Sequence, residues 1–121
     1  MRILQLFTVL FFIYPLNAKG QAPFRKIKNE AFKAGEILEY RIHYGFVDAG
    51  IARLEIKPDL SEINNRNCYH IVGIGQTKGA FDWFFKVRDR FESYIDSDAL
   101  MPWVFIRKVE EGSYRKSQHV T

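Results

Sequence analysis

Three histidines and one cysteine are the residues of this sequence best suited to chemistry, and their spacing argues against a shared site. Cys68 and His70 are two positions apart, so on an extended strand their side chains point to the same face about 7 Å apart. At that distance the imidazole is too far from the thiol to activate it. His43 and His119 fall on other predicted strands, and no pair of ligands has the short spacing of a zinc site. The sequence therefore predicts no catalytic residue, no metal site and no cofactor.

The same residues have ordinary structural explanations. Cys68 is the only cysteine, so it forms no internal disulfide, and a free cysteine is most often a small buried apolar residue. His70 shares a predicted strand face with Cys68 and Val72, which favours a buried, hydrogen-bonded histidine over a metal ligand. His43 lies on the polar side of its strand and is expected to be exposed. The stretch GIGQTKG lacks the Gly-Lys-Ser/Thr ending of a phosphate-binding loop, so that interpretation is rejected.

Two charged residues fall where the alternating pattern predicts an apolar side chain. Asp89 shares a strand face with Val87 and Phe91, and Arg107 shares one with Phe105. An inward carboxylate must be paired or solvated. Two explanations stay open: an Asp89–Arg107 ion pair, or a place for Asp89 at the open end of its strand, where water solvates it.

Alternation of apolar and polar residues predicts the strands that position these side chains. The five predicted strands cover residues 35–45, 51–57, 68–77, 87–96 and 100–111. A tight turn at Glu111–Gly112 leads into a further alternating segment at 113–121. Residues 45–50 (GFVDAG) predict a turn, and residues 61–67 (SEINNRN) predict a polar loop. The fold class is therefore mainly β, an antiparallel meander forming a curved sheet (a partial barrel) with one short helix near residues 79–86.

The helical candidate, GAFDWFFK at residues 79–86, is unusually rich in aromatic side chains. On a helix, Asp82 and Lys86 are four residues apart and are expected to pair weakly. Three interpretations of the aromatic side chains stay open. They fill the core as a plug at one end of the sheet, they form the wall or lid of an apolar cavity, or they make an exposed wedge that touches a membrane or a partner.

Residues 1–22 predict a secretory signal peptide. Arg2 supplies the positive start, and Ile3–Leu16 form an apolar run too short to span a bilayer comfortably. Small residues follow, so cleavage is expected after Ala18 or after Ala22; the alternative is an uncleaved membrane anchor. The protein is therefore expected to be exported, with no stable transmembrane span once the signal is removed.

The rest of the chain is expected to hold a flexible lead at residues 23–34 and, at residues 35–121, the N-terminal part of one β-barrel-like domain. Alternation is still under way at Thr121, which predicts that the chain is a fragment of a longer protein. Removing Arg2 and Lys19 with the signal peptide takes the formal net charge from +4 to about +2. With no block of basic residues, nucleic acid is not an expected partner.

Three segments resemble an exported Gram-negative family catalogued as the domain of unknown function DUF3108. They are FKAGEILEYRIHYGFVDAGIARLEI, GAFDWFFKVRDRFESYID and LMPWVFIRKVEEGSYRKSQHVT, which together with their connections span residues 32–121. The most specific parts are Gly35–Glu36, Ala49–Gly50 and Pro102–Phe105. The resemblance implies a β-barrel or half-barrel in the cell envelope, in the periplasm, loosely like carriers of outer-membrane lipoproteins, and it supplies no catalytic residues.

Three functions remain open on this evidence. The first is a non-enzymatic envelope protein that holds a lipid-like or other apolar ligand in the concavity of its sheet. The second is a structural or interaction module with a filled core and an envelope protein as partner. The third is an envelope enzyme whose catalytic groups lie beyond Thr121. The candidate ligand-lining residues are Tyr40, Ile42, Tyr44, Phe81, Trp83, Phe84, Phe85, Trp103 and Phe105.

Overall fold

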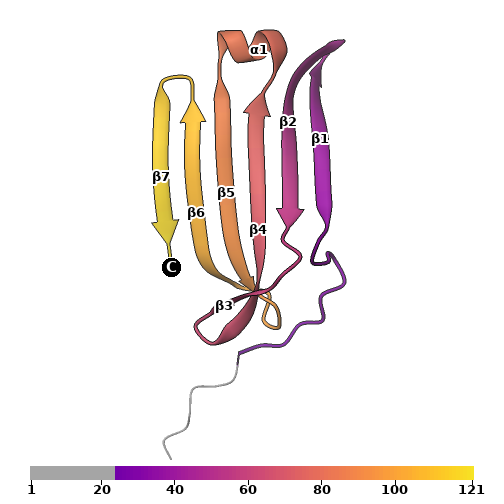
Figure 1. Cartoon of the computed structure of the whole chain (residues 1–121), viewed down its shortest axis with the longest axis vertical. Helices are drawn as coiled ribbons and strands as arrows, with labels where there is room; N and C mark the ends of the chain where they lie inside the picture. The colour runs from indigo at the N-terminus through magenta and orange to yellow at the C-terminus, as the bar shows by residue number, and fades with distance from the viewer. Residues whose placement is uncertain (1–23) are drawn as a thin grey trace, which may run out of the picture.

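A single antiparallel sheet dominates the computed structural model, which describes residues 24–121 (Figure 1). The predicted signal peptide lies outside the described residues. The elements are β1 (Ile37–Tyr44), β2 (Val47–Ile56), β3 (Ser61–Ile63), β4 (Arg66–Thr77), α1 (Gly79–Phe84), β5 (Val87–Asp96), β6 (Pro102–Glu111) and β7 (Tyr114–Val120). The strand order is β1-β2-β4-β5-β6-β7, and β3 pairs with β4. The predicted class, an antiparallel meander with one short helix, is confirmed.

Two loop predictions were wrong at the level of single turns. β2 begins at Val47, so the first turn is shorter than the predicted 45–50, and Gly45 supplies its positive φ of 62°. Residues 61–67 are not a loop but a hairpin between β3 and β4. Asn64 and Asn65 form its turn with φ values of 51° and 60°, the left-handed pair that a tight hairpin turn requires and that asparagine tolerates.

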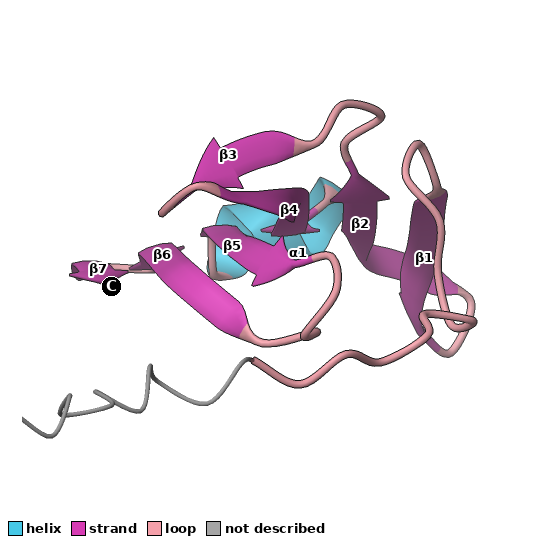
Figure 2. Cartoon of the chain, turned by 90° about the horizontal axis from the view of Figure 1, so that it is seen from below, coloured by secondary structure: helices cyan, strands magenta, loops and turns pink. Residues whose placement is uncertain are grey.

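The sheet is curved but open. Seen from its end in Figure 2, it bends toward the side on which residues 24–36, the lead, run from the β5–β6 corner to β1. Within the described chain, β1 and β7 are the outermost strands and do not pair with each other. The curved sheet is as predicted, whereas a closed barrel is not what these residues form.

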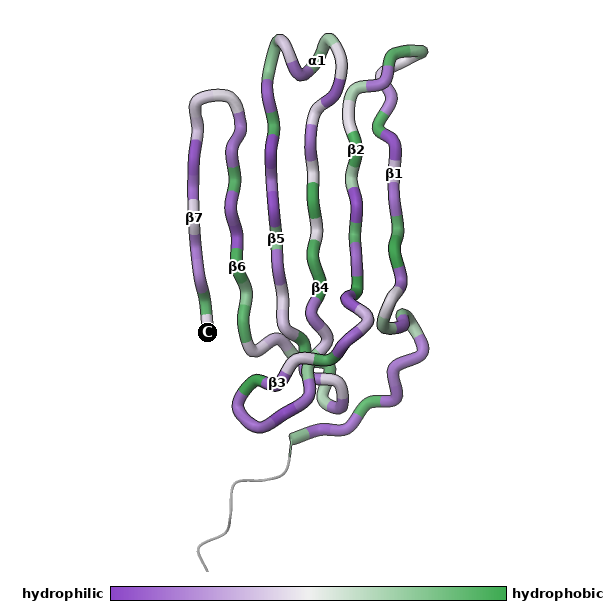
Figure 3. Tube along the Cα trace, viewed as in Figure 1, coloured by the Kyte–Doolittle hydropathy of each residue, from purple (hydrophilic) through white to green (hydrophobic). Residues whose placement is uncertain are grey.

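The register gives the sheet two chemically different faces. One row across the strands contains Leu38, Leu54, Gly73 and Phe91, and the next row contains Tyr40, Ala52 and Gly75. We call this side the apolar face. The opposite side carries mainly charged residues, such as Glu39, Arg53, Glu55, Arg90 and Glu92. Figure 3 shows the resulting alternation of hydrophobic and hydrophilic residues along β2 and β4.

The fully buried interior is small. Its apolar members are Ile56, Cys68, Val72, Ala99 and Val109. Cys68 is 0% exposed, as predicted, and burial is the main cause of its raised pKa. Several large apolar side chains on β1, β2 and α1 remain exposed. Among the residues described, none of the helices has the length and apolar character needed to cross a membrane.

Candidate functional site

The apolar face carries a shallow groove of about 290 Å³. Two glycines and an alanine form its floor, and larger apolar side chains stand on either side. Its lining residues are Tyr40, Ala52, Arg53, Leu54, Gly73, Ile74, Gly75 and Phe91. A surface of this kind, mainly apolar and concave, is typical of sites for small hydrophobic molecules.

The groove exists because β4 lacks side chains there, not because the backbone forbids them. A Cβ on Gly73 would meet Leu54 and Phe91 at 3.8 Å, and a Cβ on Gly75 would meet Asp89 at 4.0 Å. These are ordinary contact distances, and neither glycine has a positive φ. A larger residue would therefore fit at either position and would occupy the space that the glycines leave open.

The predicted lining residues are only partly brought together. Tyr40 lines the groove, and Ile42 and Phe105 share its face. Tyr44 meets Phe81 edge to face, with ring centroids 6.1 Å apart, at the end of the sheet that holds α1. Trp103 contacts the buried corner around Asp96. The alternation of residues had placed the faces correctly, but the pair of glycines was the stronger signal for the groove.

The interpretation of α1 as a core plug is wrong for its most prominent rings. Trp83 is 83% exposed and Phe84 is 75% exposed, and none of the helix residues is buried. The two rings contact each other, with centroids 5.0 Å apart, rather than the interior of the sheet. α1 therefore forms a knob at one end of the sheet (Figure 1).

A polar cluster holds this knob in place. Asp82 accepts hydrogen bonds from Thr77 Oγ1 at 2.8 Å and from Arg88 Nη1 at 2.7 Å. The hydrogen bonds of Arg88 and Thr77 lower the pKa of Asp82. The predicted Asp82–Lys86 pair is therefore wrong: the helix ends at Phe84, and Arg88 at the start of β5 takes that carboxylate.

Phe85 fixes the knob on its other side. Its ring lies against Gly112 in the β6–β7 turn, where an added Cβ would come within 2.7 Å of Phe85 Cε2. Gly112 also has a φ of 60°, so both the backbone and the ring require glycine there. The turn and the segment after α1 therefore fit each other closely.

At the opposite end of the sheet, a buried carboxylate organises a corner. Asp96 is 1% exposed and binds the Arg66 guanidinium through both Nε and Nη2. It also accepts hydrogen bonds from the Trp103 indole at 3.0 Å and from the backbone N–H groups of Asp98 and Ala99. The Arg66 hydrogen bond is the main reason why the pKa of Asp96 lies far below its usual range. Every donor is satisfied, so the corner is structural.

The family of the chain follows from a match to a family model. The model, described as a protein of unknown function (DUF3108), matches residues 39–121. The chain belongs to this family. No curated protein and no solved structure matches it. The resemblance predicted from the sequence is confirmed, and the functional argument for this DUF3108 chain rests on its own geometry.

The histidines of the DUF3108 chain do not converge. His70 Nε2 lies 2.9 Å from Glu92 Oε1 and stacks on Tyr94, so it is a satisfied, half-buried histidine as predicted. Burial alone would raise the pKa of Glu92, but hydrogen bonds from Arg90 and His70 outweigh it and lower that pKa. His43 is exposed and contacts Asp48 at 2.8 Å. Over residues 24–121, no group of three or more His, Cys, Asp or Glu residues is arranged to hold a metal ion.

The Asp89–Arg107 pair is also wrong, because register separates the two residues. Asp89 faces Val109 and accepts a hydrogen bond from the Glu110 backbone N–H at 3.2 Å. Its carboxyl is the main cause of the raised pKa of Glu111. Arg107 faces Phe91 and lies 6.0 Å from the centroid of its ring, with a buried Nε that has no hydrogen-bond partner. The groove thus has a cationic neighbour beside Phe91.

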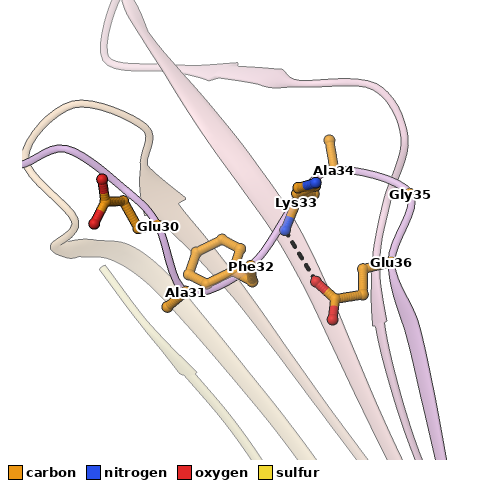
Figure 4. A pocket seen from close by; sticks show the side chains of 7 residues that line it. All are labelled: Glu30, Ala31, Phe32, Lys33, Ala34, Gly35 and Glu36. Atoms are coloured by element: carbon orange, nitrogen blue, oxygen red, sulfur yellow. Dashed lines mark hydrogen bonds between the residues drawn. The ribbon is translucent and has the colours of Figure 1, made fainter.

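A larger hollow, of about 440 Å³, is unrelated to this face. Its lining is the contiguous segment 30–36 of the lead, and Figure 4 shows the hydrogen bond from the Lys33 N–H to Glu36 that closes the bend. Phe32 in the same segment contacts Tyr69 of β4, with ring centroids 5.0 Å apart. The hollow is the inside of a surface bend, and it gathers no chemically active groups.

Proposed function

We propose that this DUF3108 chain is an exported cell-envelope protein that binds a lipid-like, apolar ligand on the apolar face of its sheet. The observation that carries the proposal is the groove floored by Gly73 and Gly75, where β4 leaves room next to exposed apolar side chains. Binding would remove this surface from water, which is the main favourable contribution to association with an apolar ligand. The predicted signal peptide supports the envelope location.

The surroundings of the groove favour a ligand with an acidic head. Tyr40 lies at the β1 side and is 57% exposed, so its hydroxyl is available to orient a polar group. Arg107 lies beyond Phe91 on the same face, and its guanidinium carries a donor without a partner. An apolar chain lying across β2 and β4 would then point its head toward one of these two groups. A long-chain carboxylate combines both features.

The direct test fills the groove without disturbing the fold. Gly75→Val places a β-branched side chain where a Cβ has ordinary contacts, so the variant should fold at least as stably as the parent. We expect it to weaken binding of a fluorescent fatty-acid probe by tenfold or more. Gln76→Val is the matched control, because the neighbouring residue of β4 points to the charged face and should leave probe binding unchanged.

Two results would refute the proposal: a parent protein that binds no probe and carries no lipid in native mass spectrometry, or equal probe binding by Gly75→Val and the parent. The second candidate, an interaction module, is favoured by β1 and β7, whose residues are exposed throughout and whose outer edges carry no further strand in the described chain. It predicts a co-purifying protein and no retained lipid.

A further inference from the structure

Five exposed aromatic side chains gather at one end of the sheet. Figure 1 shows that the β1–β2 turn and α1 lie at this same end. We call it the aromatic end, and its exposed rings are Tyr44, Phe46, Trp83, Phe84 and Phe85. Phe46 projects fully into solvent from its turn, and Trp83 and Phe84 do so from the knob. Exposed rings grouped in this way mark interaction surfaces, because isolated exposed apolar residues are common but clusters of them are not.

The charge around these rings is positive. Lys78 and Lys86 flank α1 on both sides and are exposed. The acid inside the helix, Asp82, is neutralised by Arg88, and Asp48 near the first turn is paired with His43. α1 and its polar contacts therefore present two uncompensated lysines beside the exposed rings, while Asp89 and Glu111 lie further along, beside β6.

We propose that the aromatic end docks this protein onto an anionic membrane surface. Tryptophan and phenylalanine rings enter the region between headgroups and acyl chains, and flanking lysines pair with lipid phosphates. The rings protrude from short, well-anchored elements: Asp82 ties α1 to Thr77 and Arg88, and Phe85 lies against Gly112. The docking surface is therefore preformed and separate from the groove.

The docking surface can be tested by vesicle sedimentation of the chain as isolated from its producing cells. The vesicles contain phosphatidylcholine alone or with about one-third phosphatidylglycerol. We expect the double variant Trp83→Ser/Phe84→Ser to lower the partition coefficient by at least tenfold, since two exposed rings no longer leave water. Lys78→Gln/Lys86→Gln should lower it by roughly fivefold per lysine on the anionic vesicles only.

The matched control removes two exposed apolar residues far from the aromatic end. Ile37→Ser/Leu60→Ser does so at the start of β1 and in the loop after β2, and vesicle binding should not change. All of these positions are exposed, so far-ultraviolet circular dichroism and melting temperature should match the parent. Gly75→Val should also bind vesicles normally, so that failure of the groove proposal and failure of this one are distinguishable.

Three results would overturn the inference. The parent does not sediment with either vesicle, the control loses as much binding as the aromatic variant, or light scattering shows a dimer of the parent that Trp83→Ser/Phe84→Ser dissociates. The last result would identify the aromatic end as a contact between two copies of the chain instead of a membrane surface.

Discussion

Asp96 is the residue on which most of the lower end of the sheet depends. It joins β4, the β5–β6 corner and β6 through Arg66, two backbone N–H groups and Trp103. A buried ion pair contributes little compared with a well-packed apolar substitute, but removal of one partner leaves the other uncompensated. Its role is therefore to specify one arrangement of the corner.

Asp96→Asn should lower the free energy of unfolding by about 3 kcal/mol at neutral pH, because Arg66 then loses its counter-charge in a buried setting. Urea unfolding followed by tryptophan fluorescence measures the change. Asp98→Asn is the matched control, since Asp98 is exposed and contributes its backbone rather than its carboxylate to the corner. Equal stabilities of the two variants would contradict the role assigned to Asp96.

The same pair predicts a pH dependence. Because the folded-state pKa of Asp96 is depressed, its contribution is fully present above about pH 5 and is lost as the pH falls through the ordinary aspartate pKa near 4. Asp96→Asn should therefore lose less free energy of unfolding than the parent between about pH 5 and pH 3. Equilibrium unfolding at both pH values measures the difference, and identical pH slopes would contradict it.

The two hairpin turns at the upper end form a matched pair of elements. Gly45 and Gly112 have nearly the same φ, 62° and 60°, but a Cβ on Gly45 meets nothing within 4 Å, whereas one on Gly112 meets the Phe85 ring. Gly45→Ala should lower the free energy of unfolding by about 1 kcal/mol through backbone strain alone. Gly112→Ala should lower it by roughly a further 1 kcal/mol, because the ring must move.

A double variant separates strain from contact. In a Phe85→Ala background, Gly112→Ala should be about as destabilising as Gly45→Ala, because the clash has been removed. Thermal melting of the single and double variants gives the coupling between residues 85 and 112. If the penalty at Gly112 is the same with and without the ring, Phe85 does not hold the knob against this turn.

Regular elements were predictable because their side chains alternate or because glycine and proline mark their ends. The strands, the short helix and the burial of Cys68 all follow from local pattern. β3 was missed because three residues are too short to show alternation, although Asn64–Asn65 is a recognisable turn signal. The Asp82–Lys86 pair failed because the helix is one residue too short for Lys86 to lie on its face.

The site was less predictable because it depends on register. Which residue faces Asp89 is fixed by the pairing of β5 with β6, and the shift between Tyr94 and Ile95 changes the alternation just before Trp103. A single sequence does not contain that shift. For the same reason Trp103 could not be assigned to the Asp96 corner, whereas Gly73 and Gly75 could be assigned to one face from their spacing.

At the scale of the whole molecule, the lead connects the two ends of the lower edge. Arg25 donates to the carbonyl groups of Ala99 and Leu100, and the Ile27 N–H donates to Asp98. Further along, the Gly35 N–H donates to Ile56 in β2. The lead thus crosses one side of the curved sheet between β6 and β1 (Figure 2); its predicted flexibility stays a prediction.

Arg25→Ala should release the first of these attachments and leave the second intact. Hydrogen–deuterium exchange should show faster exchange of the Ile27 amide and unchanged protection of the Gly35 amide. Lys28→Ala is the control, because Lys28 makes an exposed contact with Glu30 that is expected to contribute little. Uniform exchange in parent and variant would mean that Arg25 does not hold the lead.

The exposed strand β7 has a consequence for the behaviour of the protein in concentrated solution. Its outer backbone groups are free to pair, its residues are exposed throughout, and Figure 3 shows it hydrophilic along most of its length. Arg115 and Lys116 give this rim a positive charge that keeps identical molecules apart. Added salt screens that repulsion, so colloidal lifetime should be governed by ionic strength more than by conformational stability.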